Sequence, residues 1–309
     1  MLSVERIDIT NNYIEFPFYE TTISDFMPEE VFGQGTIYTY VTENGKPYNA
    51  YTKRGYMRKD AKDYVIVGFS SVGSSIVDIT VKKYSSISAL EKFGFCVNHR
   101  GKMAGNCSYS TSVKLNPRCM ARAKDPDSIC AICFANQLLS DYAPLEAKVA
   151  RNTAAITNRI LELSELPILR PGLFNAFRLE SFGDLNNEIQ FVNYANMARI
   201  NPGYKNVTIW TKNPDLIESA IEKYGITIPD NMNIIYSSPK VNAQVDAAAI
   251  KARYPFITAI FTVYSLEYAK AHNITINCGA RDCTNCNLCY RPHDKNNVLI
   301  VNELRKEDQ

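Results

Sequence analysis

The chain has 309 residues, 46% of them hydrophobic, so it can bury a large core as one big domain or as two smaller ones. Its formal net charge is +2 with both signs scattered along the chain, which gives no electrostatic footprint for nucleic acid or an anionic membrane. No apolar run reaches the roughly 18 residues of a membrane span, and residues 1–6 lack the pattern of a signal peptide. We therefore expect a cytoplasmic protein with no membrane and no nucleic-acid partner.

The first 84 residues have the pattern of β-strands, with short runs of β-branched and aromatic side chains separated by turns. Asn44-Gly45 is typical of a tight hairpin turn between the first two runs. We predict strands at residues 36–43, 48–52, 64–69 and 75–82. This β-rich region, residues 1–84, is predicted to be distinct from a Cys-rich β/α domain over residues 85–309.

A short helix is predicted at residues 88–93, and the stretch from Cys96 to Cys130 that follows has no regular spacing of apolar residues. It is rich in Asn, Gly, Ser, Pro and Cys. An irregular loop of this length is uncommon in a compact domain unless something other than a hydrophobic core orders it. A metal site would do so.

After Cys130 short apolar runs alternate with helical patterns. The predicted strands are residues 174–179, 207–210, 232–236, 256–263 and 274–276. The predicted helices are residues 131–139, 145–163, 186–200, 214–224, 245–254 and 266–272. This alternation predicts crossover connections and a parallel sheet. Because no glycine-rich phosphate-binding motif accompanies it, we expect an α/β fold of the partial (β/α) barrel type.

The C-terminal part carries four thiols within twelve residues: Cys278, Cys283, Cys286 and Cys289. The last three form a C-x2-C-x2-C run, the spacing with which bacterial-type ferredoxin loops hold iron–sulfur clusters. A disulfide needs two sulfurs and a buried thiol needs one, so neither explains this density. The spacing predicts a bound iron–sulfur cluster, of the [4Fe–4S] type.

A second group of thiols precedes the helical region: Cys119, Cys130 and Cys133. A C-x2-C pair can direct both sulfurs to one site from a turn or a helix start. The chain has nine cysteines, an odd number that is clustered and not spread. This usage favours a reducing compartment where thiols act as ligands over a secreted disulfide framework.

Two assemblies are open at this point. The two groups can act separately, with a closed cluster on the C-terminal thiols and a second cluster on Cys119, Cys130 and Cys133 that leaves one iron open to a ligand. Alternatively, the C-x2-C pairs can converge on one zinc ion, which prefers four tetrahedral thiolates. The pairs concerned are Cys130/Cys133 and Cys283/Cys286. The spacing favours iron–sulfur over zinc, and both over thiols without metal.

Polar residues at predicted strand ends are the remaining candidates for ligand binding. Catalytic groups of parallel β/α folds gather at the carboxyl ends of the strands. Four such residues are Arg178, Glu180, Asp184 and Lys212. Asn213 also lies at a strand end, but Asn before Pro214 is interpreted as a helix cap. No residue is assigned a catalytic role.

Four residues near these motifs have simpler interpretations. Cys96 and Cys107 are expected to be buried or half-buried thiols, although either could complete the first group. His293 follows Cys289 by four positions, where a ferredoxin run places a further ligand, but a surface loop is the expected place for it. His272 is expected to cap a helix C-terminus.

Several of these motifs occur in an order that resembles the phage "gene product 88" family. The matching segments are C-x2-C-[aromatic]-A at Cys130–Ala135, R-x-E-S-x-G-D at Arg178–Asp184, W-T-K at Trp210–Lys212, and Asn-Cys-Gly followed by C-x2-C-x2-C-[aromatic] at Asn277–Tyr290. The resemblance covers roughly residues 96–300 and leaves the β-rich N-terminus outside.

The resemblance implies a phage or prophage iron–sulfur protein with a barrel distantly similar to radical-SAM enzymes, in the host cytoplasm. The chain departs from a radical-SAM core, because C-x3-C-x2-C near the first strand is absent. S-adenosylmethionine as a cofactor is therefore compatible with the first thiol group, Cys119, Cys130 and Cys133, but no motif of the chain predicts it. We expect a redox or radical-SAM-like enzyme acting on a small ligand at an open iron, with an unidentified redox partner. The alternative is a structural or electron-transfer metal protein without catalysis.

Overall fold

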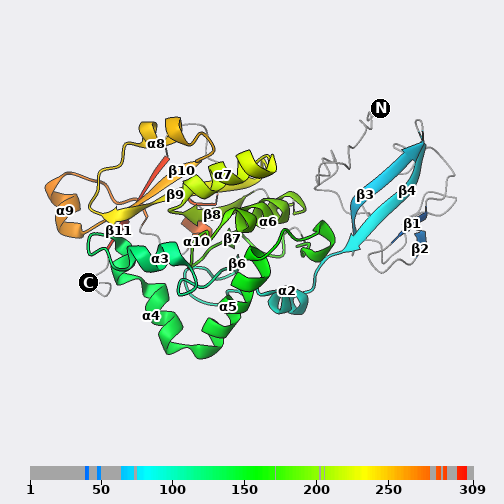
Figure 1. Cartoon of the computed structure of the whole chain (residues 1–309), viewed down its shortest axis with the longest axis horizontal. Coiled ribbons are helices and arrows are strands. Elements are labelled where there is room, and N and C mark those ends of the chain that lie inside the picture. Colours follow the sequence, from blue (N-terminus) through cyan, green and yellow to red (C-terminus); the bar gives the residue numbers. More distant parts are fainter. Residues whose placement is uncertain are drawn as a thin grey trace. The chain divides into compact units, whose positions relative to one another are not determined.

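The computed structural model describes residues 39–41, 47–49, 64–72, 75–170, 172–201, 203–204, 206–278, 283–286, 288–290 and 298–304 (Figure 1). The chain divides into two units. Unit 1 takes the chain up to residue 89 together with 162–173 and 199–203, and unit 2 takes 90–161, 174–198 and 204 onward. Among the described helices, none is both long and apolar enough to cross a membrane.

Unit 1 contains a four-stranded sheet in the order β2-β1-β4-β3. Its strands are β1 (Thr39–Val41), β2 (Pro47–Asn49), β3 (Tyr64–Val72) and β4 (Ser75–Lys83). β3 and β4 pair as a long antiparallel hairpin, β1 pairs antiparallel with β2, and β1 runs parallel to β4. All four predicted strands are confirmed. The predicted Asn44-Gly45 turn lies outside the described residues.

Segments distant in sequence complete unit 1. The amide of Ser85 donates to the carbonyl of Ile168 (2.7 Å), and the Ile168 amide donates back to Ser85 Oγ (3.2 Å). Asn201 accepts from the amide of Leu169 (2.6 Å) and donates to the carbonyl of Pro167 (3.0 Å). These contacts explain why residues 162–173 and 199–203 belong to unit 1. A single boundary at residue 84, as predicted from the sequence, does not include these two segments.

Unit 2 is built on a seven-stranded open sheet in the order β11-β10-β9-β8-β7-β6-β5. The strands are β5 (Cys96–Val97), β6 (Cys107–Tyr109), β7 (Phe177–Leu179), β8 (Val207–Thr211), β9 (Met232–Val241), β10 (Ala259–Tyr264) and β11 (Val298–Glu303). β6 to β11 are parallel and lie in chain order, and only β5 is antiparallel to its neighbour. The mixed α/β class with a mostly parallel sheet is confirmed.

Helices connect the strands of this sheet. Three of them follow β6, namely α3 (Pro117–Arg122), α4 (Phe134–Asp141) and α5 (Ala143–Thr157), with the 3-10 turn η4 (Ile129–Ile132) between α3 and α4. The later crossovers use α6 (Glu188–Arg199), α7 (Pro214–Tyr224), α8 (Ala247–Arg253) and α9 (Leu266–Ala271). The remaining helices are α2 (Ile87–Phe93), the 3-10 turn η5 (Leu163–Glu165) and α10 (Cys283–Cys286).

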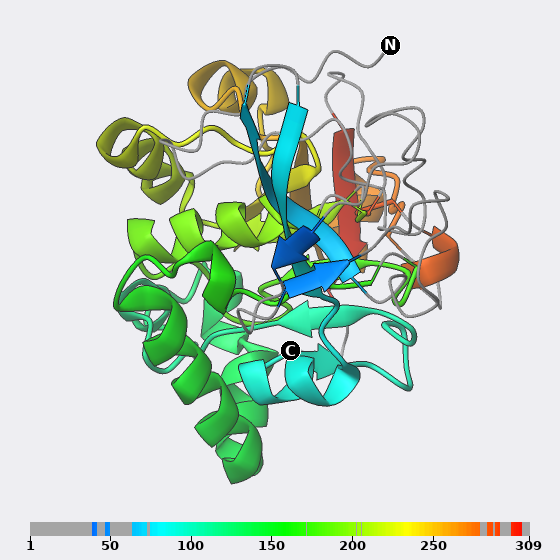
Figure 2. The same ribbon diagram turned by 90° about the vertical axis from the view of Figure 1, so that its right-hand side faces the viewer.

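The two faces of the sheet are covered differently. Figures 1 and 2 show α6, α7 and α8 along one face, as expected when right-handed crossovers join strands in chain order. The opposite face carries the C-terminal thiol loop. There the buried residues Ile235, Ala259 and Ile300 pack with a set of half-buried neighbours, which are Trp210, Phe261, Cys278, Leu288 and Cys289. The thiol loop is therefore part of the core on the face that lacks the crossover helices.

Local sequence explains where two of the helices begin and end. α7 starts at Pro214, whose fixed φ suits a first helical position, and ends at Gly225 in the left-handed region (φ 62°). α3 also has proline in its first turn, and the Asn116 side chain caps it by accepting from the amides of Arg118 and Cys119. This cap fixes the start of the helix that carries Cys119.

Two sequence-based predictions about elements are wrong. The segment from Cys96 to Cys130, expected to be irregular, contains β5, β6 and α3. Strands of two and three residues are too short to show a period, and their place in the sheet comes from pairing with β7. The strand predicted at residues 274–276 is absent from the described structure there, and β11 occupies the position beside β10.

Candidate metal and ligand site

A pocket of about 380 Å³ opens at the carboxyl ends of the parallel strands in unit 2. Each strand from β7 to β11, or the segment just after it, contributes to the wall, for example Arg178, Lys212, Ser237, Val263 and Leu304. α3, η4 and α4 line the pocket from the other side. Ligands of parallel α/β proteins bind at this end of the sheet.

The first thiol group, Cys119, Cys130 and Cys133, lines this pocket. Cys119 lies on α3, Cys130 on η4, and Cys133 at the junction of η4 and α4. Burial raises the pKa of the Cys119 thiol, and the nearby groups of Asp184, Cys130 and Cys133 raise it further, whereas Lys212 lowers it. The three thiols that the sequence groups together therefore line the same pocket.

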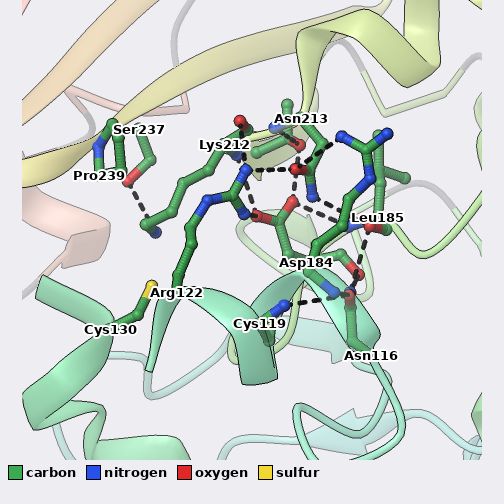
Figure 3. Close-up of polar contacts among 12 residues, drawn as sticks. Asn116, Cys119, Arg122, Cys130, Asp184, Leu185, Lys212, Asn213, Ser237 and Pro239 are labelled. Carbon is green, nitrogen blue, oxygen red and sulfur yellow. Dashed lines mark hydrogen bonds and ion pairs between the residues drawn. The ribbon is translucent and has the colours of Figure 1, made fainter. Parts of the chain in front are cut away.

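α3 is fastened to the ends of β7 and β8 by side-chain contacts. Asn116 donates to the carbonyls of Asp184 (3.0 Å) and Leu185 (3.1 Å). Arg122 donates to Asn213 Oδ1 (2.5 Å) and to the carbonyl of Lys212 (3.1 Å). Figure 3 shows the Arg122 guanidinium between these groups. These contacts hold the helix that carries Cys119 over the strand ends.

The second thiol group comprises Cys278, Cys283, Cys286 and Cys289. All of these except Cys286 line the same pocket. Burial raises the pKa of Cys289 to about 12, the Cys278, Cys283 and Cys286 thiols raise it as well, and Arg178 opposes the rise. The charges of the other three thiols thus act on Cys289, and Cys278, Cys283 and Cys289 share the wall of one pocket.

Backbone contacts anchor this loop. Cys278 forms a bridge to Asn302 of β11, and its amide donates to the carbonyl of Val301 (2.9 Å). The carbonyl of Cys289 accepts from Thr208 Oγ1 (3.3 Å), and the amide of Cys283 donates to the carbonyl of Lys102 (2.9 Å). The loop is thus tied to β8, to β11 and to the turn between β5 and β6.

Arg178 lines the pocket together with three thiols of the second group. Its guanidinium stacks over the Trp210 ring at 4.0 Å, and Nη2 donates to the carbonyl of Ser181 (3.3 Å). The Trp210 ring in turn contacts Tyr290 edge-on, with ring centroids 5.6 Å apart. Trp210 and Tyr290 also line the pocket; both belong to the motifs of the sequence, where no role is predicted for them.

The carboxylate of Glu180 is held inside the protein. Glu180 is 2% exposed and accepts from Thr111 Oγ1 (2.9 Å), Gln190 Nε2 (2.7 Å) and Tyr194 Oη (2.5 Å) on one oxygen. Its other oxygen accepts from the Thr111 amide (3.1 Å). Burial raises the pKa of Glu180 to about 8, against the hydrogen bonds from Tyr194 and Thr111, which lower it. Glu180 lines the pocket, but its oxygens are occupied by protein donors.

Asp184 is also engaged by the protein. Its Oδ1 accepts from Thr211 Oγ1 (2.6 Å) and from the Leu185 amide (2.8 Å), and its Oδ2 accepts from the Lys212 amide (3.0 Å). Arg122 forms an ion pair with the same carboxylate at 3.8 Å. Asp184 thus links the ends of β7 and β8 to α3.

Lys212 extends into the pocket, where its ammonium donates to Ser237 Oγ (3.2 Å), as Figure 3 shows. The prediction that its neighbour Asn213 caps a helix is confirmed for the position but not for the side chain. Asn213 occupies the N-cap position of α7, but its side chain makes no capping hydrogen bond there. Its side-chain oxygen instead accepts from Arg122, and its side-chain nitrogen donates to the Leu185 carbonyl (3.0 Å). The side chain thus turns away from the helix amides toward these partners.

Of the remaining sequence candidates, Cys96, Cys107 and His272 do not line the pocket. Cys107 is buried and Cys96 is half-buried, as expected, and Lys148 Nζ donates to Cys96 Sγ (3.3 Å). His272 is the C-cap of α9 and its ring stacks on Tyr268 at 3.9 Å, which confirms the capping interpretation. His293 lies outside the described residues.

The donor set of the site consists of thiols, which suits an iron–sulfur core better than a hard cation. Burial and neighbouring thiols raise the pKa of Cys119 in the first group and of Cys278 and Cys289 in the second, so a positively charged core beside them would favour the thiolate form that binds metal. Among the described residues, no three His, Cys, Asp or Glu side chains converge as they would around a single metal ion. The fit of these residues to an iron–sulfur core thus depends on the chemistry of the thiol donors.

Comparison with known proteins adds no relative. No protein-family model, curated protein or solved structure matches this chain.

Proposed function

We propose that unit 2 is an iron–sulfur protein that binds a small ligand in the pocket between its two thiol groups. The observation that supports this most strongly is that six of the seven predicted thiol ligands line one pocket at the carboxyl ends of the parallel strands. These thiols come from two segments about 145 residues apart in the chain, so their meeting at one cavity is a property of the fold and not of sequence spacing.

The arrangement of the sheet supports a partial (β/α) barrel as the scaffold. Six parallel strands follow one another in chain order, with α6, α7 and α8 along one face and the thiol loop packed on the other. A (β/α) barrel has this strand order and puts its functional groups at the carboxyl ends. The scaffold is thus consistent with the resemblance to the phage "gene product 88" family and its radical-SAM-like barrel.

Each thiol group has a distinct role in this proposal. Cys278, Cys283, Cys286 and Cys289 supply the four thiolates that close a [4Fe–4S] cluster. The first group supplies three, which leaves one position for a ligand. An iron–sulfur core bound there would supply electron transfer or a coordination site for that ligand.

The four strand-end residues divide into two pairs. Glu180 and Asp184 organise the site, since their oxygens accept hydrogen bonds from the protein. Arg178 and Lys212 present positive charge to the pocket and to the thiols. We propose that the hydrogen bonds of Glu180 and Asp184 keep the strand ends in place, while Arg178 balances the charge of the ligated thiolates and Lys212 faces the ligand.

Metal analysis of anaerobically purified protein tests this proposal. We expect iron and acid-labile sulfide in near-equal amounts and a brown colour, which Cys286→Ser diminishes. The matched control is Cys107→Ser, since this buried thiol lies outside the pocket. Zinc without sulfide, after reconstitution with iron and sulfide, would contradict the proposal.

A further inference from the structure

Two cationic side chains line the pocket, and they differ in their partners. Arg178 stacks on Trp210, donates to the Ser181 carbonyl, and acts on the thiols of Cys278 and Cys289. Lys212 has a hydrogen bond to the neutral hydroxyl of Ser237 (3.2 Å). In the described part of the chain, no carboxylate lies within 4.0 Å of the Lys212 ammonium.

The two acidic residues of the pocket do not neutralise Lys212. Glu180 accepts hydrogen bonds from Thr111, Gln190 and Tyr194. Asp184 accepts the backbone amide of Lys212 and not its ammonium. The side-chain charge of Lys212 is thus directed into the cavity without a protein counter-ion among the described residues. A half-buried ammonium in this position favours an anion as its partner.

The part of the pocket wall formed by α3, η4 and α4 carries apolar side chains. Met120 of α3 and Ile132 of η4 are each 39% exposed, and Phe134 at the start of α4 is 60% exposed. All three line the same pocket and lie next to thiols of the first group in the sequence. Exposed large apolar side chains gathered at a cavity are a common feature of ligand sites. This wall would cover the apolar part of a ligand.

We infer that the pocket binds a small amphipathic anion, whose carboxylate or phosphate binds Lys212 and whose apolar body lies against Met120, Ile132 and Phe134. Ser237, which is 8% exposed, holds the ammonium in place for this contact. The pocket volume of about 380 Å³ includes the space that the proposed iron–sulfur cores would fill, and the remainder suits a small ligand. The inference names the ligand class of the proposed function and rests on that function only for the role of the first thiol group.

Four probes with one aromatic ring and different head groups test the inference: benzoate, phenyl phosphate, benzylammonium and benzyl alcohol. Their dissociation constants for anaerobically purified full-length protein can be measured by nuclear magnetic resonance of the probe. We expect the two anions to bind more tightly than the alcohol, and benzylammonium to bind most weakly. The comparison of benzoate with phenyl phosphate shows which of the two anionic groups the site prefers.

Lys212→Met should weaken benzoate or phenyl phosphate at least about tenfold, since a charge-assisted hydrogen bond is lost, and should leave benzyl alcohol unchanged. Lys212→Arg should restore most of the anion binding. The matched control is Lys270→Met, on an exposed turn of α9 outside the pocket.

Three results would overturn the inference: no binding of either anion, equal affinity for anions and alcohol, or loss of anion binding in Arg178→Met but not in Lys212→Met. Iron and sulfide are measured on the same preparations. If the protein contains no iron but binds the anions through Lys212, the proposed function is contradicted and the ligand class holds. If the protein contains iron and sulfide but does not bind the anions, the ligand class is contradicted and the proposed function holds.

Discussion

Arg122 on α3 forms an ion pair with Asp184 at the end of β7, with Nη1 3.8 Å from Oδ2. Arg122 follows Cys119 by three positions, so the two side chains lie on neighbouring positions of one helix face. The same guanidinium donates to Asn213 and to the Lys212 carbonyl. The contact therefore couples the placement of the first thiol group to the ends of β7 and β8.

Replacing Arg122 by Met should release α3 and weaken metal binding at the first thiol group only. We expect about half of the iron to be lost, because residues that orient metal ligands commonly change metal affinity by about 10-fold to 100-fold. Iron analysis and electron paramagnetic resonance of the purified variant measure this loss. The control is Arg151→Met, an exposed arginine on α5. Unchanged iron content in Arg122→Met would show that this contact does not position Cys119.

Gly183 has to be glycine because of Glu180. Its φ is +105°, and a Cβ there would lie 2.3 Å from Glu180 Oε2 and 2.7 Å from the Thr111 carbonyl oxygen. We expect Gly183→Ala to destabilise the protein by roughly 2–4 kcal/mol, from backbone strain and the displaced carboxylate. Gly225→Ala is the matched control, since φ is also positive (+62°) but nothing lies within 4 Å of the added Cβ. Chemical denaturation of both variants compares them, and equal losses would mean that the Glu180 contact is unimportant.

Glu180 should make stability depend on pH. Its pKa rises from the ordinary value of 4.5 to about 8, chiefly through burial. Between these values the folded protein holds a proton that the unfolded chain has released, so stability falls as the pH rises through this window. The neutral variant Glu180→Gln lacks this effect. The free energy of unfolding of the wild type relative to the variant, measured by chemical denaturation, should therefore decrease from pH 4.5 to pH 8, on the order of a few kcal/mol. A constant difference would show that Glu180 does not titrate there.

The only tryptophan of the chain, Trp210, reports on metal in the pocket. It packs in the same core cluster as Cys278 and Cys289. Iron–sulfur clusters absorb light where tryptophan emits, so reconstitution with iron and sulfide should quench the emission strongly. Zinc, which has a filled d shell, should leave the emission nearly unchanged. Cys289→Ser should reduce the quenching by iron. Full emission in an iron-loaded protein would place the cluster away from Trp210.

The parts of this fold that the sequence predicts are those with a long, regular pattern. The helix at Pro214–Tyr224 is predicted to the residue, because proline and glycine mark its two ends. β6, with three residues, has no such pattern and is defined by its pairing with β7. β11 was missed because it follows the thiol loop, beyond the point where the alternation was expected to end.

The candidate site shows the same limit. Thiols could be assigned to groups from spacing alone, but only the fold shows that both groups line one pocket. Charged residues at strand ends could be found, yet their partners could not. Asp184 accepts hydrogen bonds from Thr211 and from the backbone amide of Lys212, whereas the Lys212 side chain lines the pocket. Arg122 went unnoticed, although its spacing from Cys119 on one helix was a usable signal.

Iron content of two complementary variants tests the central claim most directly. One variant carries serine at Cys119, Cys130 and Cys133, and the other carries serine at Cys278, Cys283, Cys286 and Cys289. If the groups bind separate clusters, each variant keeps part of the iron and sulfide, and the two reduced-state paramagnetic spectra add up to that of the wild type. If either variant loses all iron, or if both lose a single bound zinc ion, the two groups share one metal site and the account is contradicted.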